Sequence, residues 1–219
     1  MSAPSNAFLL VISGQRGFGK TSLLKGWDPP GQPGQPGLLS RLPGRVVLVD
    51  PIGSFAEIAE GIPTASRFAE LLLQLDAGEW EYPSSIFRLV PENDTDAGAM
   101  FALLYESKLR CTIVVDEASM WHGDSHLESI AQYNRNPERG GQSLVVVARR
   151  LKELPPNIRS QADVTVSFRQ QEPGDLSELR KLGFDESKLI AMDKGELMAA
   201  GALSHLPSGV KNVIDSWHV

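Results

Sequence analysis

The sequence predicts a three-layer α/β/α domain with a mainly parallel central sheet. Short runs of almost uninterrupted apolar residues alternate along the chain with stretches of helical spacing. Strands that are apolar at nearly every position are typical of parallel sheets covered by helices on both faces. The first run, residues 8–12, leads into a glycine-rich turn, and a later run, residues 111–115, ends in two carboxylates. Both features are typical of the carboxyl edge of such a sheet.

The strands are placed by short apolar runs that end at turn-forming or charged residues. Pro91 closes one of these runs, and Pro155 and Pro156 break the chain before the last of the buried ones. Residues 196–200 carry a weaker signal and are expected to form an edge strand. In chain order, the other expected strands are residues 8–12, 45–50, 85–90, 111–116, 143–148 and 163–169.

The helices are placed by apolar residues that recur every three or four positions between the strands. Ser54 is a candidate N-cap for one of them, and Gly183 is the expected end of another. Residues 157–161 have room for one short helical turn after the proline pair. In chain order, the expected helices are residues 21–27, 54–60, 66–75, 94–108, 124–133 and 176–182.

Length and composition favour one globular domain over residues 1–219. Residues 28–37, rich in Pro and Gly, are expected to be a loop without packed structure, and residues 202–219 a C-terminal tail. No apolar run reaches the ~18 residues of a membrane-spanning helix, and residues 1–6 lack the features of a signal peptide. Cys111 is the only cysteine, so we expect a cytoplasmic protein in a reducing compartment.

The overall charge of the chain is acidic, with a formal net charge of −6 and a pI of about 5.3. A protein that coats DNA by charge alone would be basic. Any contact with DNA must therefore come from a local basic patch, or from one face of an oligomer.

The turn after the first strand has the spacing of a phosphate-binding loop, Gly-x-x-x-x-Gly-Lys-Thr. Glycines allow successive backbone N–H groups to converge on a phosphate, and the start of the following helix adds its positive dipole end. Lys20 is expected to reach the β- and γ-phosphates of ATP, and the Thr21 hydroxyl to bind Mg²⁺. The expected nucleotide-binding residues are Gly14, Gln15, Arg16, Gly17, Phe18, Gly19, Lys20, Thr21 and Ser22.

Two carboxylates follow the strand at residues 111–115, at the edge where a parallel sheet binds its ligand. Asp116 is expected to complete the Mg²⁺ site beside Thr21. Glu117 is expected to orient the water that attacks the γ-phosphate, because metal and water need separate partners. The sequence therefore predicts a hydrolase that uses ATP and Mg²⁺.

The expected strand over residues 45–50 ends in the step Asp50-Pro51-Ile52-Gly53. Together with the phosphate loop and the Asp116–Glu117 strand, this step resembles the FtsK–HerA superfamily of DNA-pumping ATPases. The small size of the chain is most similar to the genome-packaging ATPases of membrane-containing tailless viruses and phages. Asp50 itself is open to two interpretations, a direct chemical role or a turn stabilised by Asp50 and Pro51.

The resemblance implies a RecA/FtsK-like P-loop domain that hydrolyses ATP with Mg²⁺ and moves double-stranded DNA into a viral capsid. The partners it implies are duplex DNA, further copies of the chain in a ring, as a hexamer, and proteins of the capsid vertex or viral membrane. It places the protein in the host cytoplasm or at the virion vertex. A cellular DNA-processing ATPase of the same superfamily is an alternative.

Arginines of this superfamily reach into the ATP site of the neighbouring subunit, and Arg135 and Arg139 are the matching candidates here. Both are also open to interpretation as solvated loop residues. Arg149, at the end of the strand over residues 143–148, stands where the superfamily usually has a polar sensor. It could sense the γ-phosphate, act in a neighbouring subunit, or pair with a carboxylate.

A local basic stretch, residues 149–159, is a candidate DNA contact in the otherwise acidic chain, with a solvated surface as the alternative. Trp121 and His122 are expected to form a loop that could bear on DNA.

Two rival classes are a small-molecule P-loop kinase and a switch-type P-loop protein. Residues 138–150 could be the arginine-rich lid of a kinase, but the water-activating Glu117 argues against that class. No Asn/Thr-Lys-x-Asp step for guanine is present.

Overall fold

A computed structural model of the protein describes residues 7–28, 34–76, 86–121, 123–134 and 141–217. Over these residues the chain alternates between strands and helices, as the sequence predicts. The strands are β1 (Leu9–Ser13), β2 (Gly26–Trp27), β3 (Gln35–Pro36), β4 (Arg45–Val49), β5 (Gly61–Ile62), β6 (Ile86–Leu89), β7 (Cys111–Val115), β8 (Ser143–Ala148), β9 (Val164–Ser167) and β10 (Met198–Gly201).

The helices fill the connections between the strands of the main sheet, and several short 3₁₀ turns accompany them. The α-helices are α1 (Lys20–Lys25), α2 (Ala65–Asp76), α3 (Asp94–Ser107), α4 (Ser125–Tyr133), α5 (Pro156–Gln161), α6 (Pro173–Lys181), α7 (Glu186–Ala191) and α8 (Ser208–Ser216). The 3₁₀ helices are η1 (Leu38–Arg41), η2 (Ala118–Trp121), η4 (Leu151–Glu153) and η5 (Leu203–His205).

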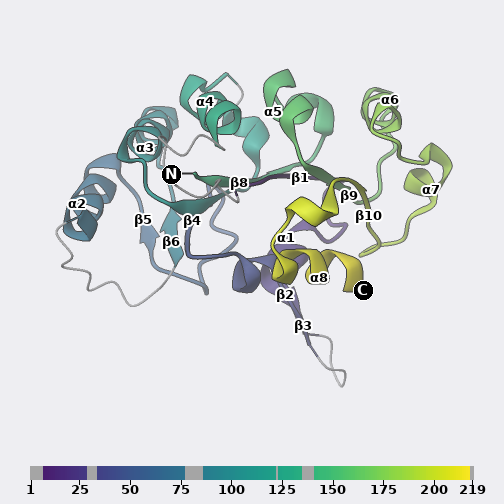
Figure 1. Ribbon diagram of the computed structural model, residues 1–219, viewed down its shortest axis with the longest axis horizontal. Coiled ribbons are helices and arrows are strands. Elements are labelled where there is room, and N and C mark those ends of the chain that lie inside the picture. Colours follow the sequence, from purple (N-terminus) through teal and green to yellow (C-terminus); the bar gives the residue numbers. More distant parts are fainter. Residues whose placement is uncertain (1–6, 29–33, 77–85, 122, 135–140, 218–219) are drawn as a thin grey trace.

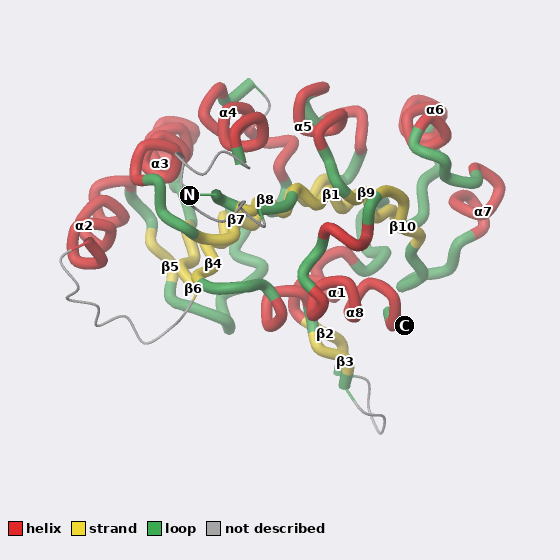
Figure 2. Tube along the Cα trace, in the orientation of Figure 1, coloured by secondary structure: helices red, strands yellow, loops and turns green. Residues whose placement is uncertain are grey.

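The main sheet has the strand order β10-β9-β1-β8-β7-β4-β6-β5 (Figures 1 and 2). Its strand pairs are parallel except for β10, which runs antiparallel to β9 at one edge. The predicted mainly parallel sheet is therefore confirmed. Because β1, β8 and β7 are neighbours and parallel, the phosphate-loop candidate, Arg149 and the acidic pair all follow strands that end at the same edge.

Helices cover both faces of the sheet, which gives the predicted three layers (Figure 1). Helices α2 to α7 lie over one face, and α1 and α8 lie over the other with η1. Two buried apolar clusters match these faces, because side chains of each strand alternate between them. Leu9 and Val11 of β1 belong to the first cluster, whereas Leu10 and Ile12 belong to the second.

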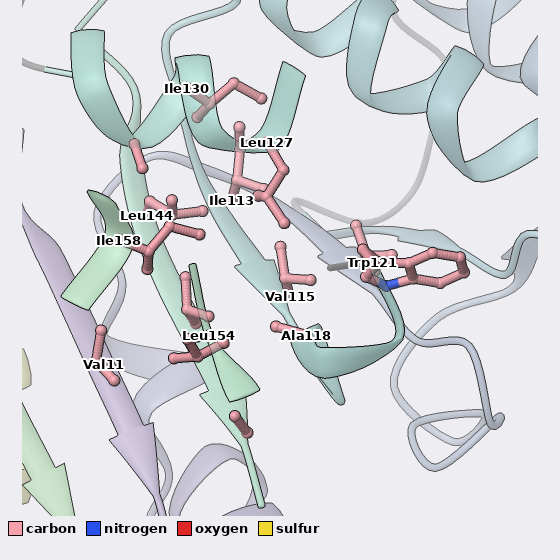
Figure 3. Packing of buried hydrophobic residues seen from close by; sticks show 14 of the residues in the cluster. Val11, Ile113, Val115, Ala118, Trp121, Leu127, Ile130, Leu144, Leu154 and Ile158 are labelled. Atoms are coloured by element: carbon pink, nitrogen blue, oxygen red, sulfur yellow. The ribbon is translucent and has the colours of Figure 1, made fainter. Parts of the chain in front are cut away.

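The first cluster also anchors the turn that follows β7. Figure 3 shows Ile113 and Val115 of β7 beside Leu127 of α4, with Ala118 and Trp121 of η2 closing the end of the strand. The Trp121 ring packs edge-on against Phe101, with 6.1 Å between the ring centroids. The turn that carries the acidic pair is thus fixed on both sides by buried side chains.

The helix expected over residues 54–60 is wrong, because this segment forms turns. The Asp50 carboxylate accepts hydrogen bonds from the Ser54 and Phe55 N–H groups, at 2.8 and 2.9 Å, and Phe55 is buried. These contacts fold the segment back onto the end of β4 instead of releasing it as a helix.

The two segments expected to lack packed structure contain ordered elements. The short antiparallel ribbon β2–β3 brackets the Pro/Gly-rich loop, of which residues 29–33 lie outside the described residues. The expected C-terminal tail contains α8, whose Val210, Val213 and Ile214 are buried in the second cluster. Helix α7 and strand β5 were also not expected. Among the described residues, no helix has the length and apolar character needed to cross a membrane.

Candidate active site

The loop between β1 and α1 makes a tight turn that depends on glycine. Gly14, Gly17 and Gly19 have φ values of 149°, 83° and 114°, a region that residues with side chains rarely adopt. A Cβ on Gly14 would lie 2.6 Å from the Cβ of Phe168, and one on Gly19 would lie 2.9 Å from the Phe168 ring. Phe168 therefore packs directly against the loop and leaves no space for a side chain at Gly14 or Gly19.

Neighbouring strands hold the loop through its backbone. The Gly14 N–H donates to the Arg149 carbonyl at 3.3 Å, and the Gln15 N–H donates to the Arg169 carbonyl at 3.1 Å. On the far side, the Gly195 N–H donates to the Phe18 carbonyl at 3.2 Å. The loop is thus tied to the ends of β8 and β9 and to the segment before β10, which fixes its shape in advance of any ligand.

Lys20 is the first residue of α1, and its side chain is buried inside the loop. Its ammonium donates to the Gly14 carbonyl at 2.6 Å and to the Gln15 carbonyl at 3.0 Å. Burial lowers the pKa of this ammonium; the nearby Glu117 and Asp116 carboxylates raise it, and Arg149 lowers it. A buried cation held inside a glycine-rich turn fits an anionic ligand such as a phosphate. Thr21 and Ser22 follow it, half-buried.

Asp116 is buried at the end of β7, and its N–H donates to the Val49 carbonyl at 3.0 Å. Burial raises the pKa of its carboxyl to about 6, and the nearby Glu117 and Asp50 charges add to this effect. Lys20 and the Glu117 N–H act in the opposite direction. A bound cation would stabilise the ionised form of this buried carboxyl, so Asp116 is chemically suited to be a Mg²⁺ ligand.

Glu117 has a left-handed backbone, with φ of 47°, which turns the chain sharply at the end of β7. Both carboxylate oxygens accept hydrogen bonds from Arg149 Nε, at 3.1 and 3.3 Å. Of the interpretations open for Arg149, the pairing with a carboxylate is the one the structure displays. The structure therefore brings Lys20, Asp116, Glu117 and Arg149 together; their catalytic and metal-binding roles stay predictions.

Asp50 is fully buried at the end of β4 and lies near Asp116. Arg88 Nε of β6 donates to it at 2.7 Å, in addition to the Ser54 and Phe55 N–H groups. Three donors of the protein thus engage both oxygens of this fully buried carboxylate, which favours the structural interpretation over a direct chemical role. The partner Arg88 could not be inferred from the sequence because it lies on another strand.

The candidate DNA contacts are placed differently from expectation. Trp121 is buried in the first cluster, so it does not bear on DNA, and His122 lies outside the described residues. Within the basic stretch, Arg150 pairs with the buried Asp175 at 3.0 Å and Arg159 pairs with Glu178 at 2.8 Å. These arginines stabilise the packing of α6 against the rest of the chain. Arg135 and Arg139 lie outside the described residues.

A cleft of about 530 Å³ opens beside Glu117 and Arg149. Two of its lining side chains, Ile52 and Met120, are large and apolar yet 57% and 53% exposed. Ile52 belongs to the Asp50 turn and Met120 to η2, so the turns after β4 and β7 flank the carboxylate–arginine pair.

Two residues of the site were missed by the sequence argument. Phe168 supports the loop glycines, and the buried Gln170 donates from Nε2 to the Arg149 carbonyl at 3.1 Å. Both follow β9, whose carboxyl end lies beside β1. The signal that could have found them is their position just after a predicted parallel strand.

The fold is that of P-loop ATPase structures, with a mostly parallel eight-stranded sheet between helices. The genome-packaging NTPase B204 from Sulfolobus turreted icosahedral virus 2, in complex with AMPPCP, matches with a TM-score of 0.66 and 16% identity, over 92% of this chain and 95% of that one. B204, the DNA-packaging ATPase from Sulfolobus turreted icosahedral virus, matches with a TM-score of 0.63 and 16% identity, over 93% and 96%.

A more distant match is VirB4 of Thermoanaerobacter pseudethanolicus, with a TM-score of 0.52 and 11% identity, over 92% of this chain and 89% of that one. No protein-family model matches the sequence, and no curated protein sequence matches it. The resemblance to viral genome-packaging ATPases is thus confirmed by structural similarity, which at these identities establishes the fold.

Proposed function

We propose that this protein is a Mg²⁺-dependent ATPase that packages double-stranded DNA into a viral capsid. The observation that carries the proposal is the gathering of Lys20, Asp116 and Glu117 at the edge of the sheet where β1 and β7 end. The fold match to B204 supports the DNA-packaging part, because it spans nearly the whole of both chains. A cellular DNA-processing ATPase is the second candidate within the same fold.

The loop residues bind the phosphates of ATP. The backbone N–H groups of residues 16–19 converge on the β- and γ-phosphates, while those of Gly14 and Gln15 hold the loop to its neighbours. Lys20 supplies a positive charge, whose attraction to the phosphates is strong because the ammonium is buried. The loop is held by three backbone hydrogen bonds to neighbouring segments, so little reorganisation is needed when the phosphates bind.

The two acids after β7 have separate roles, one in binding the metal and the other in orienting the attacking water. Thr21 and Asp116 hold Mg²⁺, which neutralises charge on the phosphates when it is bound. Glu117 accepts a hydrogen bond from the attacking water and aligns it with the γ-phosphate. Asp116 is buried and Glu117 faces the cleft, which supports this division.

The kinase alternative is weakened by the position of β8. Residues 143–148, which fall within the stretch that could have been a lid, form a buried strand between β1 and β7. A lid must move over the phosphates, whereas this strand is part of the core. Transfer of phosphate to water is therefore the reaction that the arrangement favours.

The test is phosphate release from Mg·ATP with and without duplex DNA. We expect the wild-type protein to release phosphate faster with duplex DNA, and Glu117→Gln to lose at least about a hundredfold in turnover while it still binds nucleotide. Glu70→Gln, which changes an exposed carboxylate on α2, is the matched control and should keep full turnover. Turnover by Glu117→Gln equal to that of the control would refute the assignment of Glu117, and indifference to DNA would refute the motor.

We further propose that the active form is a ring, as a hexamer, in which Arg135 or Arg139 reaches the ATP site of the next subunit. A guanidinium suits the charge that develops on the γ-phosphate. The double variant Arg135→Ala, Arg139→Ala should then lose turnover in assembled rings. Full turnover per subunit in that variant would rule out an arginine supplied by the neighbour.

A further inference from the structure

The ion pair between Glu117 and Arg149 joins the two residues that face the cleft beside the proposed ATP site. Arg149 Nε lies 3.1 Å from one carboxylate oxygen and 3.3 Å from the other. The Arg149 side chain is 48% exposed and that of Glu117 only 15%. A half-exposed ion pair is weak because solvent screens it, so a stronger anion nearby can compete for the guanidinium.

Arg149 lies between the phosphate loop and the acids. Strand β8 separates β1 from β7, and neighbouring strands are about 4.8 Å apart. The Arg149 carbonyl accepts hydrogen bonds from the Gly14 N–H and from Gln170 Nε2. The backbone of Arg149 is thus hydrogen-bonded to the loop. Only the Arg149 side chain can move between the Glu117 carboxylate and a phosphate bound in the loop.

Glu117 is fixed in a similar way. Its left-handed backbone is followed by η2, where the Met120 N–H donates to the Glu117 carbonyl at 2.9 Å. The buried Trp121 and Ala118 anchor η2 in the core. Breaking the Glu117–Arg149 ion pair therefore requires only that the two side chains move, because the turns that carry them are held in place. Charges at both residues reach the loop, since the pKa of Lys20 responds to Glu117 and to Arg149.

We propose that Arg149 exchanges partners, from Glu117 in the free protein to the terminal phosphate when a nucleoside triphosphate is bound. The inference rests on the proposed ATP site and specifies its regulation. In the free and diphosphate states the carboxylate is held by Arg149. When the γ-phosphate draws the guanidinium away, the Glu117 oxygens are released to accept a hydrogen bond from water. Glu117 thus becomes available only when a triphosphate is in place.

The exchange is tested by equilibrium binding of Mg·AMPPCP and Mg·ADP to four proteins: wild type, Glu117→Gln, Arg149→Gln and the double variant. In the wild type, AMPPCP must break the ion pair before it gains Arg149. Glu117→Gln should therefore raise the preference for AMPPCP over ADP about threefold when Arg149 is present, and leave it unchanged in the Arg149→Gln background. Glu153→Gln, which changes another carboxylate of the cleft, should leave the preference unchanged.

An equal gain in the two backgrounds would overturn the exchange, because it would mean that the carboxylate acts on the nucleotide independently of Arg149. Crystal structures of the wild type with each nucleotide give the second readout. We expect Arg149 Nε to leave Glu117 with AMPPCP and to stay within hydrogen-bond distance of it with ADP. Nucleotide binding with the ion pair intact in both would overturn the exchange alone. Failure to bind either nucleotide would overturn the proposed function with it.

Discussion

At the scale of single residues, adjacent acids at the end of β7 have different environments. Asp116 is buried beside Asp50 and Lys20, whereas Glu117 faces the cleft and pairs with Arg149. The difference arises because the left-handed Glu117 backbone turns the second carboxylate away from the first. One acid is thus suited to a buried cation and the other to a water at the surface.

The raised pKa of Asp116 predicts a pH-dependent cost to folding. Burial raises this pKa to about 6 from an ordinary value of 3.8. Above pH 6 the folded protein must keep a carboxylate in an unfavourable place, so ionisation of Asp116 destabilises it. The Asp116→Asn variant, without metal or nucleotide, should be more stable than the wild type at pH 8 by on the order of 2–3 kcal/mol.

This advantage of Asp116→Asn should shrink as the pH falls from 6 towards 3.8, and most of it should be gone at pH 4, where the Asp116 carboxyl of the folded wild type is protonated. Urea unfolding in EDTA at pH 8 and pH 4 measures it. Glu92→Gln, at an exposed carboxylate, is the control and should show no comparable change. A stability difference between Asp116→Asn and the wild type that is the same at both pH values would contradict the assignment.

At the scale of elements, the buried ion pair Asp50–Arg88 joins the ends of β4 and β6 and shapes the turn over residues 50–60. The Arg88→Met variant would leave Asp50 as a buried charge with backbone N–H partners only. We expect a loss of about 3–5 kcal/mol in the free energy of unfolding. Adding Asp50→Asn should recover part of it, because the charge is removed.

The matched control is Arg67→Ala, which breaks the exposed Arg67–Glu70 pair on α2 and should cost less than about 1 kcal/mol. Urea unfolding at pH 7 measures all three variants. If Arg88→Met were no more destabilising than Arg67→Ala, the Asp50–Arg88 pair would not be what holds the turn.

The same turn shows where prediction from sequence stops. Strand β8 was predicted at its true bounds, and the other predicted strands were placed to within two residues at each end, because an uninterrupted apolar run is a local signal. The helix expected over residues 54–60 failed because Asp50, Arg88 and Phe55 fold that segment by contacts between distant parts of the chain. In the site, the loop and the acids were recognisable as motifs, whereas Phe168, Gln170 and the Glu117–Arg149 pair depend on which strands are neighbours.

At the scale of the whole molecule, the order of the strands brings the site together. Local patterns do not reveal that β8 lies between β1 and β7, because the pairing of β1 with β8 joins residues 135 positions apart, such as Leu9 and Leu144. The prediction of a C-terminal tail was also wrong. Helix α8 is short, and the role of its apolar residues becomes clear only from their packing against η1 and the second cluster. Helix α8 lies over the same face of the sheet as α1 (Figure 1).

The packing of α8 predicts that this helix is needed for stability. Ile214 is buried in the second cluster, and Ile214→Ala should cost about 2–4 kcal/mol in the free energy of unfolding. Asp215→Ala, at the next position, removes an exposed carboxylate that pairs with Lys211 and should cost less than about 1 kcal/mol. Equal unfolding midpoints for the two variants in urea would show that α8 does not contribute to the core.

The central claim is that the loop after β1 and the acids after β7 form one Mg²⁺–triphosphate site. Calorimetric titration of the protein with AMPPCP, with Mg²⁺ and with EDTA, tests it most directly, using wild type and Lys20→Ala shown to be folded by circular dichroism. The account predicts one nucleotide per chain, with affinity reduced at least about tenfold both by EDTA and by Lys20→Ala. Binding that is indifferent to Mg²⁺ and to Lys20, or a folded wild type that binds no nucleotide, would contradict it.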